Sequence, residues 1–136
     1  MNAKQVPNLN MISLNCRGLS NVKKRKSIFS WCKKQKGDII FLQETHSTEK
    51  AEKEWKINWG GEIFFSNGKS NKRGVTILIK KGLDFEEEKV ITDSRGRIII
   101  IRAKIQGAPL VLANIYAPNK DKELVDFYRS MRISVT

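Results

Sequence analysis

The chain has 136 residues, and 40% of them are hydrophobic, which is the size and composition of one folded domain. Its longest apolar stretches have the length of a strand and its start is polar, so the sequence predicts neither a membrane span nor a secretory signal, and an intracellular protein is expected. The formal net charge of +12 favours a polyanionic partner, and nucleic acid fits better than membrane lipid because no segment pairs a basic face with a wide aromatic face.

The first third of the sequence predicts a strand, a helix and a second strand. Residues 1–10 are expected to form a flexible leader, and residues 11–15 the first strand. Residues 22–35 predict a helix because apolar residues recur at intervals of three and four, and Gly37 follows its end. Residues 38–43 predict the second strand, and the spacing is that of a right-handed crossover between parallel strands.

A short helix and then a series of strands are predicted next. The helix runs through Trp55, and Ser47 or Thr48 is expected to cap it. Turn residues separate the strands, which are predicted at residues 62–66, 75–80, 89–92, 98–105 and 110–116. We expect one mixed sheet with helices packed on one face, an α/β (α+β) architecture.

The end of the sequence predicts an incomplete domain. A final helix is expected after Pro118 and Asn119, and residues 133–136 look like the beginning of another strand. The second face of a sheet must be covered by another layer, and no later segment supplies one. The expectation is therefore a truncated domain over residues 11–136, with one face of its sheet left open.

Polar side chains follow the first two strands, at the end where an open α/β sheet binds its ligands. Glu44 comes after the apolar run 39–42, and Asn15 ends the first strand. A carboxylate suits Mg²⁺, and an amide can hold a phosphate oxygen or orient a metal-bound water. The alternatives are a surface Glu after a strand and an Asn that stabilises the turn before Gly18.

Other polar residues are candidates with strong alternatives. Tyr116 ends the last predicted strand, where a phenol can donate to a phosphoryl oxygen as charge develops on it. The alternative is a rim aromatic that packs on the final helix. Asn119 is well placed as the N-cap of that helix. His46, the only histidine, lies two residues beyond Glu44, but its position favours a loop residue over a general base.

Basic residues beside glycine suit close approach to a phosphate backbone. They are Arg17, Arg73 and Arg97, and solvated turn charges are the alternative. The basic run 23–26, with the later lysines of the same helix, predicts the solvated side of that helix. The two cysteines lack metal-ligand spacing and predict reduced thiols.

The order of these motifs is more specific than any one of them. In chain order they are Leu14-Asn15-Cys16-Arg17-Gly18, Leu42-Gln43-Glu44-Thr45-His46, Arg73-Gly74-Val75 and Asn114-Ile115-Tyr116-Ala117-Pro118-Asn119. This order resembles the endonuclease/exonuclease/phosphatase superfamily, which includes exodeoxyribonuclease III. Within it, the chain looks most like the apurinic-type endonuclease domain that begins the reverse-transcriptase polyprotein of LINE-type retrotransposons.

The resemblance implies the first half of a four-layered, DNase I-like α/β sandwich that cleaves phosphodiester bonds in DNA with Mg²⁺ or Mn²⁺. By motif, Glu44 corresponds to the metal ligand, Asn15 to the catalytic network around the scissile phosphate, and Tyr116 to a contact with that phosphate. The positions that fall where the family contacts DNA are Arg17, Arg73, Arg97 and Asn119. The implied partners of a full-length parent are DNA and a reverse transcriptase domain, and the implied location is the nucleus.

The sequence departs from the family pattern in its later motifs. It has no Gly-Asp-x-Asn motif, whose Asp positions the attacking water, and no Asp-His pair near its C-terminus. The predicted function is therefore a Mg²⁺-dependent DNA endonuclease, present as a fragment that is inactive by itself. The alternatives left open are a basic fragment that binds DNA without cutting it, a non-functional remnant, and a phosphatase branch of the same superfamily.

Overall fold

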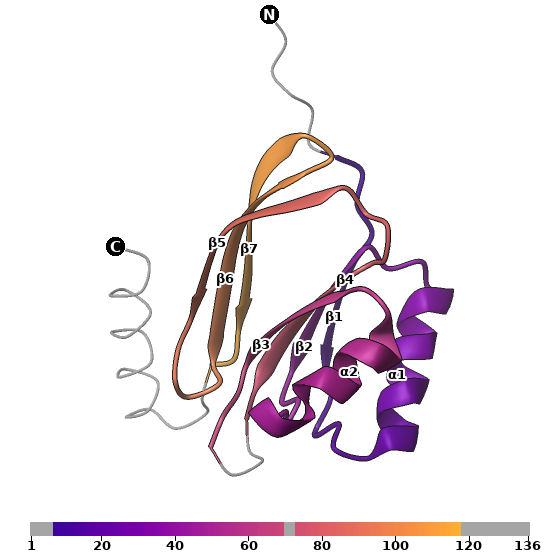
Figure 1. Cartoon of the computed structure of the whole chain (residues 1–136), viewed down its shortest axis with the longest axis vertical. Coiled ribbons are helices and arrows are strands. Elements are labelled where there is room, and N and C mark those ends of the chain that lie inside the picture. The colour runs from indigo at the N-terminus through magenta and orange to yellow at the C-terminus, as the bar shows by residue number, and fades with distance from the viewer. Residues whose placement is uncertain (1–6, 70–72, 118–136) are drawn as a thin grey trace, which may run out of the picture.

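The computed structural model describes residues 7–69 and 73–117, which form a layer of helices and two layers of β-sheet (Figure 1). In chain order the elements are β1 (Met11–Asn15), α1 (Val22–Lys34), β2 (Ile39–Gln43), the 3₁₀ turn η1 (Glu49–Ala51), α2 (Glu52–Trp59), β3 (Glu62–Ser66), β4 (Val75–Ile79), β5 (Phe85–Thr92), β6 (Ile98–Ile105) and β7 (Ala108–Ile115).

The first sheet, sheet A, has the strand order β1-β2-β4-β3. β1 and β2 are parallel, as the crossover spacing predicts, and α1 connects them. β4 lies antiparallel between β2 and β3. Every residue of β4 is buried, because this inner strand has a layer of protein on each of its faces.

Helices α1 and α2 cover one face of sheet A, on the right of Figure 1. Phe29 of α1 packs edge-to-face against Trp55 and Trp59 of α2, with ring centroids 6.2 and 5.7 Å apart. Trp59 Nε1 donates a hydrogen bond of 2.8 Å to the carbonyl oxygen of Ile79, which ties α2 to β4. Among the described residues no helix has the length and apolar character needed to cross a membrane.

Strands β5, β6 and β7 form a second sheet, sheet B, which is an antiparallel meander. It packs against the face of sheet A that the helices leave open (Figure 1). The apolar residues buried between the two sheets are Ile39, Val75, Ile77, Ile79, Ile99, Ile101, Ala103, Ile105 and Leu112. The described part of the chain therefore has two apolar cores, one on each side of sheet A.

The predicted α/β class and the helices on one face of the sheet are confirmed, but the prediction of one mixed sheet is wrong. The described strands are divided between two sheets, and sheet B covers the face that was expected to be open. Turn residues predict which consecutive strands pair. A strand buried on one face, however, shows the same alternation whether that face meets a helix or another sheet. The predicted final helix lies outside the described residues.

At two positions, Asn10 and Thr48, the structure differs from the local prediction. Asn10, predicted to belong to a flexible leader, fixes the end of α1: its Nδ2 donates to the carbonyl oxygens of Gln35 at 2.7 Å and Lys36 at 3.0 Å. Its backbone N–H donates to the Asp38 carboxylate at 2.8 Å. Thr48 occupies the cap position of η1 but makes no side-chain capping hydrogen bond, so the predicted cap is absent there.

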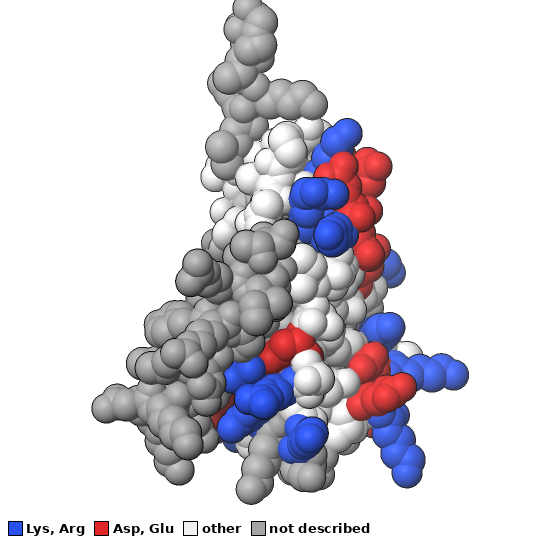
Figure 2. All heavy atoms as spheres, turned by 90° about the vertical axis from the view of Figure 1, so that its left-hand side faces the viewer, with Lys and Arg blue, Asp and Glu red and all other residues white. Residues whose placement is uncertain are grey.

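The outer face of sheet B carries acidic and basic side chains beside one another (Figure 2). Residues 86–88 of β5 are exposed glutamates, and Glu88 lies 3.7 Å from Arg102 of β6. A bulge interrupts the pairing of this edge strand between Glu87 and Lys89. Charged side chains and a bulge oppose pairing of an exposed edge with another chain. This face therefore does not present basic charge alone.

Candidate functional site

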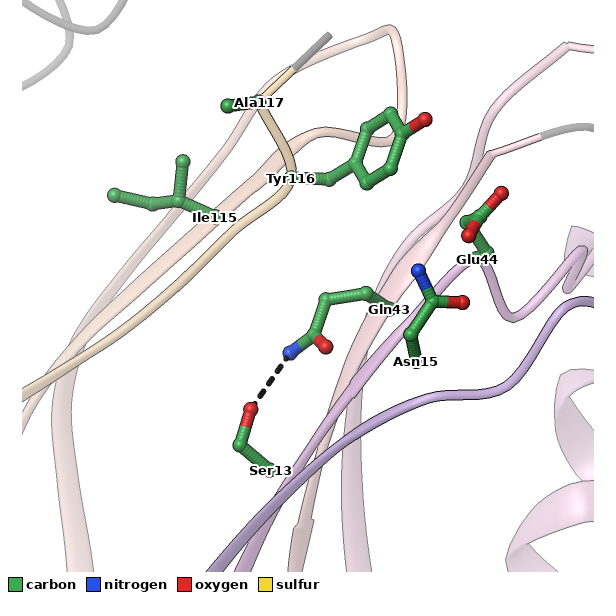
Figure 3. A pocket seen from close by; sticks show the side chains of 7 residues that line it. All are labelled: Ser13, Asn15, Gln43, Glu44, Ile115, Tyr116 and Ala117. Atoms are coloured by element: carbon green, nitrogen blue, oxygen red, sulfur yellow. Dashed lines mark hydrogen bonds between the residues drawn. The ribbon is translucent and has the colours of Figure 1, made fainter. Parts of the chain in front are cut away.

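The ends of β1 and β2 approach the end of β7 at one edge of the molecule, and a pocket of about 450 Å³ lies between them. Asn15 and Gln43 are neighbours in the parallel register of β1 and β2, and Glu44 follows at once. Tyr116 reaches the same pocket from the end of sheet B (Figure 3). The structure thus brings together Asn15, Glu44 and Tyr116, which the sequence predicted from three separate motifs.

Glu44 shares this pocket with Gln43 because the backbone leaves the strand conformation at Glu44. In a regular strand, successive side chains point to opposite faces. Glu44 has a φ of 51°, in the left-handed region, and the resulting turn lets both side chains line one pocket. Arg17, His46 and Arg73 nearby also have positive φ angles. Such conformations are disfavoured for residues other than glycine, and they cluster at functional sites where surrounding contacts hold them.

Backbone hydrogen bonds join the loops that follow β1 and β2. The N–H of Gly18 donates to the carbonyl oxygen of Glu44 at 2.6 Å, and that of Leu19 to Thr45 at 2.9 Å. Gly18 has a φ of +93°, and a Cβ atom there would lie 2.6 Å from His46 Nδ1. The imidazole of His46 therefore packs on the Gly18 backbone, and His46 is not among the residues that line the pocket.

The loop before β4 belongs to the same group. The N–H of Thr45 donates to Gly74 at 3.1 Å, and that of His46 donates to Arg73 at 2.7 Å. Gly74 has a φ of +93°, and a Cβ atom there would lie 2.6 Å from Thr45 Oγ1. Three of the sequence motifs therefore form one hydrogen-bonded edge of sheet A, and Arg73 lies on it.

Asn15 also stabilises its own turn, as the alternative interpretation predicts. Its Oδ1 accepts a hydrogen bond of 3.2 Å from the N–H of Arg17, which is exposed. In Figure 3 the amide nitrogen of Asn15 is directed toward the side of the pocket where Glu44 and Tyr116 lie. The two arrangements are compatible, because the oxygen serves the turn while the nitrogen faces the pocket.

A buried polar network connects the two sheets beneath the pocket. Asn114 of β7 is 2% exposed, and its Nδ2 donates to the carbonyl oxygens of Leu42 at 2.9 Å and Thr76 at 2.8 Å. Its Oδ1 accepts a hydrogen bond of 2.8 Å from Gln43 Nε2. Gln43 also donates to the hydroxyl of Ser13 at 3.3 Å (Figure 3). The amide of Asn114 therefore joins β7 to two strands of sheet A.

The hydrogen bonds of Asn114 hold the end of β7 against sheet A, and Tyr116 follows directly after this strand. The N–H of Tyr116 donates to the carbonyl oxygen of Arg97 at 2.8 Å, which extends the pairing of β6 and β7 by one residue. Side chains two residues apart share one face of a strand, so Tyr116 faces sheet A as Asn114 does. Sequence reasoning missed the role of Asn114. The sequence feature that could have revealed this role is the position of Asn114 on the same face of β7 as Leu112. That face is buried, and a buried amide needs hydrogen-bonding partners.

Arg97, predicted to contact DNA, is 5% exposed and binds Asp93. Its Nε lies 3.2 Å from Asp93 Oδ2, and Asp93 Oδ1 accepts from the N–H groups of Arg97 and Ile98 and from the Ser66 hydroxyl. Burial raises the pKa of Asp93, but these hydrogen bonds lower it more, so the pKa lies below its ordinary value. A DNA contact by Arg97 stays a prediction that this burial does not favour. Asn119 lies outside the described residues.

The basic run 23–26 is only partly the solvated side of α1. Arg25 is 2% exposed, and its Nη1 donates to the carbonyl oxygen of Leu19 at 3.0 Å. Burial lowers the pKa of Arg25. Lys24 Nζ donates to the carbonyl oxygen of Cys16 at 2.8 Å. These two basic side chains therefore fix the loop that follows β1.

Cys16 and Cys32 are free, buried thiols, as the sequence predicts. Burial raises the pKa of Cys16 to about 12 and that of Cys32 to about 11. Thiols with such pKa values remain protonated at neutral pH. Neither cysteine therefore has the properties of an activated nucleophile.

The pocket offers groups that suit a hydrated Mg²⁺ or Mn²⁺. Glu44 supplies a carboxylate oxygen as a ligand, and the amide nitrogen of Asn15 can donate to a water molecule of the cation. Mg²⁺ commonly takes one or two carboxylates and completes its shell with water and substrate phosphate. Within residues 7–69 and 73–117, no group of three or more His, Cys, Asp and Glu side chains gathers around one point. The donor set thus fits a cation that retains most of its water, and it does not fit a closed zinc site.

Comparisons with known proteins agree with this arrangement. The model of the Endonuclease/Exonuclease/phosphatase family matches residues 8–133. A protein of Xenopus laevis described as "Transposon TX1 uncharacterized 149 kDa protein" is 28% identical over 123 residues, a match that covers 90% of this chain and 9% of that protein.

Solved structures of apurinic-type endonucleases share the fold. The catalytic domain of APE2 from Xenopus laevis has a TM-score of 0.67 at 18% identity, and the match covers 90% of this chain and 52% of that one. The AP endonuclease LMAP from Leishmania major has a TM-score of 0.69 at 21% identity, and the match covers 92% of this chain and 46% of that one. These likenesses confirm the predicted DNase I-like α/β class. The chain spans about half the length of these structures.

Proposed function

The chain belongs to the endonuclease/exonuclease/phosphatase family, and on this premise we propose that it forms one side of the active site of a DNA endonuclease that uses Mg²⁺ or Mn²⁺. The observation that carries the proposal is the shared pocket of Asn15, Glu44 and Tyr116. A carboxylate, an amide and a phenol converge there from two different sheets. These groups suit binding of a phosphodiester and of a hydrated cation.

Each side chain has a proposed role. Glu44 would hold the cation, which when bound supplies charge neutralisation at the phosphate. Asn15 would donate from Nδ2 to a phosphate oxygen or to a water molecule. Tyr116 would donate its phenolic proton in a hydrogen bond to a phosphoryl oxygen, where charge grows during hydrolysis. Arg17 and Arg73, on the loops beside the pocket, would contact the DNA backbone.

The proposed source is a LINE-type retrotransposon. The similarity to a transposon protein of Xenopus laevis supports it, and that protein is far longer than this chain. A reverse transcriptase domain in the parent protein and a nuclear location are parts of the same proposal.

Slow or undetectable cleavage by this chain alone is also proposed. Attack by water on a phosphodiester needs an in-line water molecule and a group that accepts its proton. Among the described residues that line the pocket, Glu44 alone has a carboxylate, and that carboxylate is assigned to the cation. Loss of a general base typically lowers a rate about 10²–10⁴-fold. The net charge of +12 favours a second candidate function, which is binding of DNA without cleavage.

The test of the proposed site is titration of the ¹⁵N-labelled protein with Mn²⁺, observed by NMR. Paramagnetic Mn²⁺ bound in the pocket should broaden the amide signals of Asn15, Glu44 and Tyr116 first, and excess EDTA should restore them. Glu44→Gln should abolish this selective broadening. A matched control is Glu62→Gln, because Glu62 is exposed and begins β3 at the opposite end of sheet A.

Equal broadening in the Glu44→Gln variant and the original chain would exclude Glu44 as the metal ligand. A plasmid-nicking assay with Mn²⁺ then separates the two candidate functions. Nicking that is lost in Glu44→Gln supports the nuclease. DNA binding without nicking, together with no selective broadening by Mn²⁺ in the pocket, supports the binding function.

A further inference from the structure

A second pocket, of about 430 Å³, lies at the opposite end of sheet A from the candidate active site. It forms where α1 ends, β2 begins and β4 ends. Ile39 and Ile79 are antiparallel partners, so Lys80 and Lys81 after β4 come close to Gly37 before β2. The candidate active site lies beyond the other end of β2, roughly 15 Å away along the strand.

Four lysines from two separate parts of the chain line this pocket. Lys33 and Lys36 come from the end of α1, and Lys80 and Lys81 from the turn after β4. No acidic side chain is among the residues described as lining it. Asp38 nearby reaches Lys80 only at 3.9 Å, and this pair is partly exposed. The convergence of four cations with so little compensating charge favours an anionic ligand.

Part of the wall of the pocket is apolar and is formed by the end of α2. Trp59 is 2% exposed, its indole N–H is bonded to Ile79, and Lys33 Nζ lies 5.1 Å from the ring centroid. Ile57 beside it is 73% exposed, the highest fraction among the exposed large apolar side chains of the described residues. The pocket therefore combines positive charge with an exposed apolar side chain, that of Ile57.

From this combination we infer a binding site for single-stranded nucleic acid, in which the lysines hold phosphates and Ile57 contacts an unstacked base. The volume is near the lower end of the range for small-ligand sites, roughly 300–1,000 Å³, and suits one splayed nucleotide. A duplex keeps its bases paired and stacked, so it cannot insert one without unpairing. The site needs no metal and is independent of the proposed cleavage chemistry.

The test is fluorescence anisotropy with a labelled deoxythymidine oligomer in EDTA, so that no divalent cation contributes. The pocket variant is Lys36→Gln with Lys81→Gln. The matched control is Lys23→Gln with Lys26→Gln, two exposed lysines of α1 that do not line the pocket. Both variants lose the same charge. We expect the pocket variant to bind about tenfold more weakly and the control less than about twofold.

The salt dependence gives a second readout. Loss of two phosphate contacts on a single strand should reduce the slope of log K against log salt by roughly 1.4 in the pocket variant. Equal weakening and equal slopes in both variants would mean that only net charge matters, and the site would be rejected. Unchanged binding by the pocket variant would reject it as well.

Three further measurements identify the ligand. Ile57→Ser should weaken binding of the oligomer about threefold to tenfold and leave binding of inorganic polyphosphate unchanged, because polyphosphate has no base to contact. A matched duplex should bind without any difference between the pocket variant and its control. If the pocket variant instead loses affinity for vesicles containing phosphatidylserine and keeps its affinity for the oligomer, the site is a lipid site and the inference is wrong.

Discussion

Asn114 joins the two sheets by hydrogen bonds that an apolar side chain at this position could not make. Its amide satisfies two backbone carbonyl groups of sheet A and the side chain of Gln43 at once. A buried carbonyl or amide that loses its partner costs about 1–3 kcal/mol. A single amide therefore contributes to stability and also holds the strand from which Tyr116 projects.

Asn114→Leu should lower the free energy of unfolding by about 2–4 kcal/mol, because it leaves three polar groups without their partner in a buried place. Gln43→Leu should lower it by about 1 kcal/mol, because the two bonds from Asn114 to sheet A remain. Urea denaturation measures both values. A smaller loss for Asn114→Leu than for Gln43→Leu would contradict the network.

Asp93 makes stability depend on pH. Its pKa in the folded protein lies below the ordinary value of 3.8, since the hydrogen bonds to its carboxylate outweigh its burial. Its contribution is therefore fully present above the unfolded pKa, about 4, and is lost as the pH falls through the folded pKa. Acid should destabilise the protein in this window.

Asp93→Asn should lower stability at neutral pH by about 1–3 kcal/mol and flatten the pH dependence below about pH 4. Urea denaturation across that range measures the effect. Asp84→Asn is the control, because Asp84 is exposed. An unchanged acid limb in the Asp93 variant would show that other carboxylates cause the acid sensitivity.

At the scale of elements, the loops after β1, β2 and before β4 act as one unit. Four backbone hydrogen bonds connect them, and left-handed residues turn Glu44 toward the pocket. Glycine is required at Gly18 and Gly74, where the next loop lies against the backbone. This explains why two of the sequence motifs have a glycine beside a strand, Gly18 after β1 and Gly74 before β4.

Gly18→Ala tests this packing. Its Cβ atom would lie 2.6 Å from His46 Nδ1, and its φ of +93° adds strain. Gly82→Ala is a matched control, because Gly82 has a φ of +86° but open space around its Cβ position. Thermal denaturation should report a loss of about 1 kcal/mol for Gly82→Ala and about 1–3 kcal/mol more for Gly18→Ala. Equal losses would mean that the two loops are not packed as described.

At the scale of the whole molecule, sheet A is covered on both faces. Helices α1 and α2 cover one face and sheet B covers the other. A chain with an open sheet face would be expected to aggregate or to lack fixed packing. Because this second core joins the two sheets, we expect the described part of the chain to unfold cooperatively.

Ile101→Ala should therefore destabilise the protein by about 2–5 kcal/mol, because Ile101 is fully buried between the sheets. Val111→Ala in neighbouring β7 should change stability by less than about 0.5 kcal/mol, since Val111 is 65% exposed. Circular dichroism during urea denaturation measures both. A broad, non-cooperative transition of the unmodified chain would instead support a non-functional remnant.

Much of the local structure is predictable from the sequence. The parallel β1 and β2, helix α1 and the strand β6 all follow from apolar periodicity and from turn residues, which act between near neighbours. The positions of Asn15, Glu44 and Tyr116 at strand ends follow from the same signals. The roles of these three residues remain predictions, as do the DNA contacts of Arg17 and Arg73.

The sequence by itself determined the family, the elements and the polar residues at their ends, because each depends on contiguous motifs or short-range periodicity. The tertiary structure alone decided that β5–β7 form a second sheet, that Asn114 bridges the sheets, and that Arg25 and Arg97 are buried. These features depend on which surfaces meet across long sequence separations. Alternation of apolar and polar residues along a strand indicates that one face is buried, but it does not indicate whether a helix or another sheet covers that face.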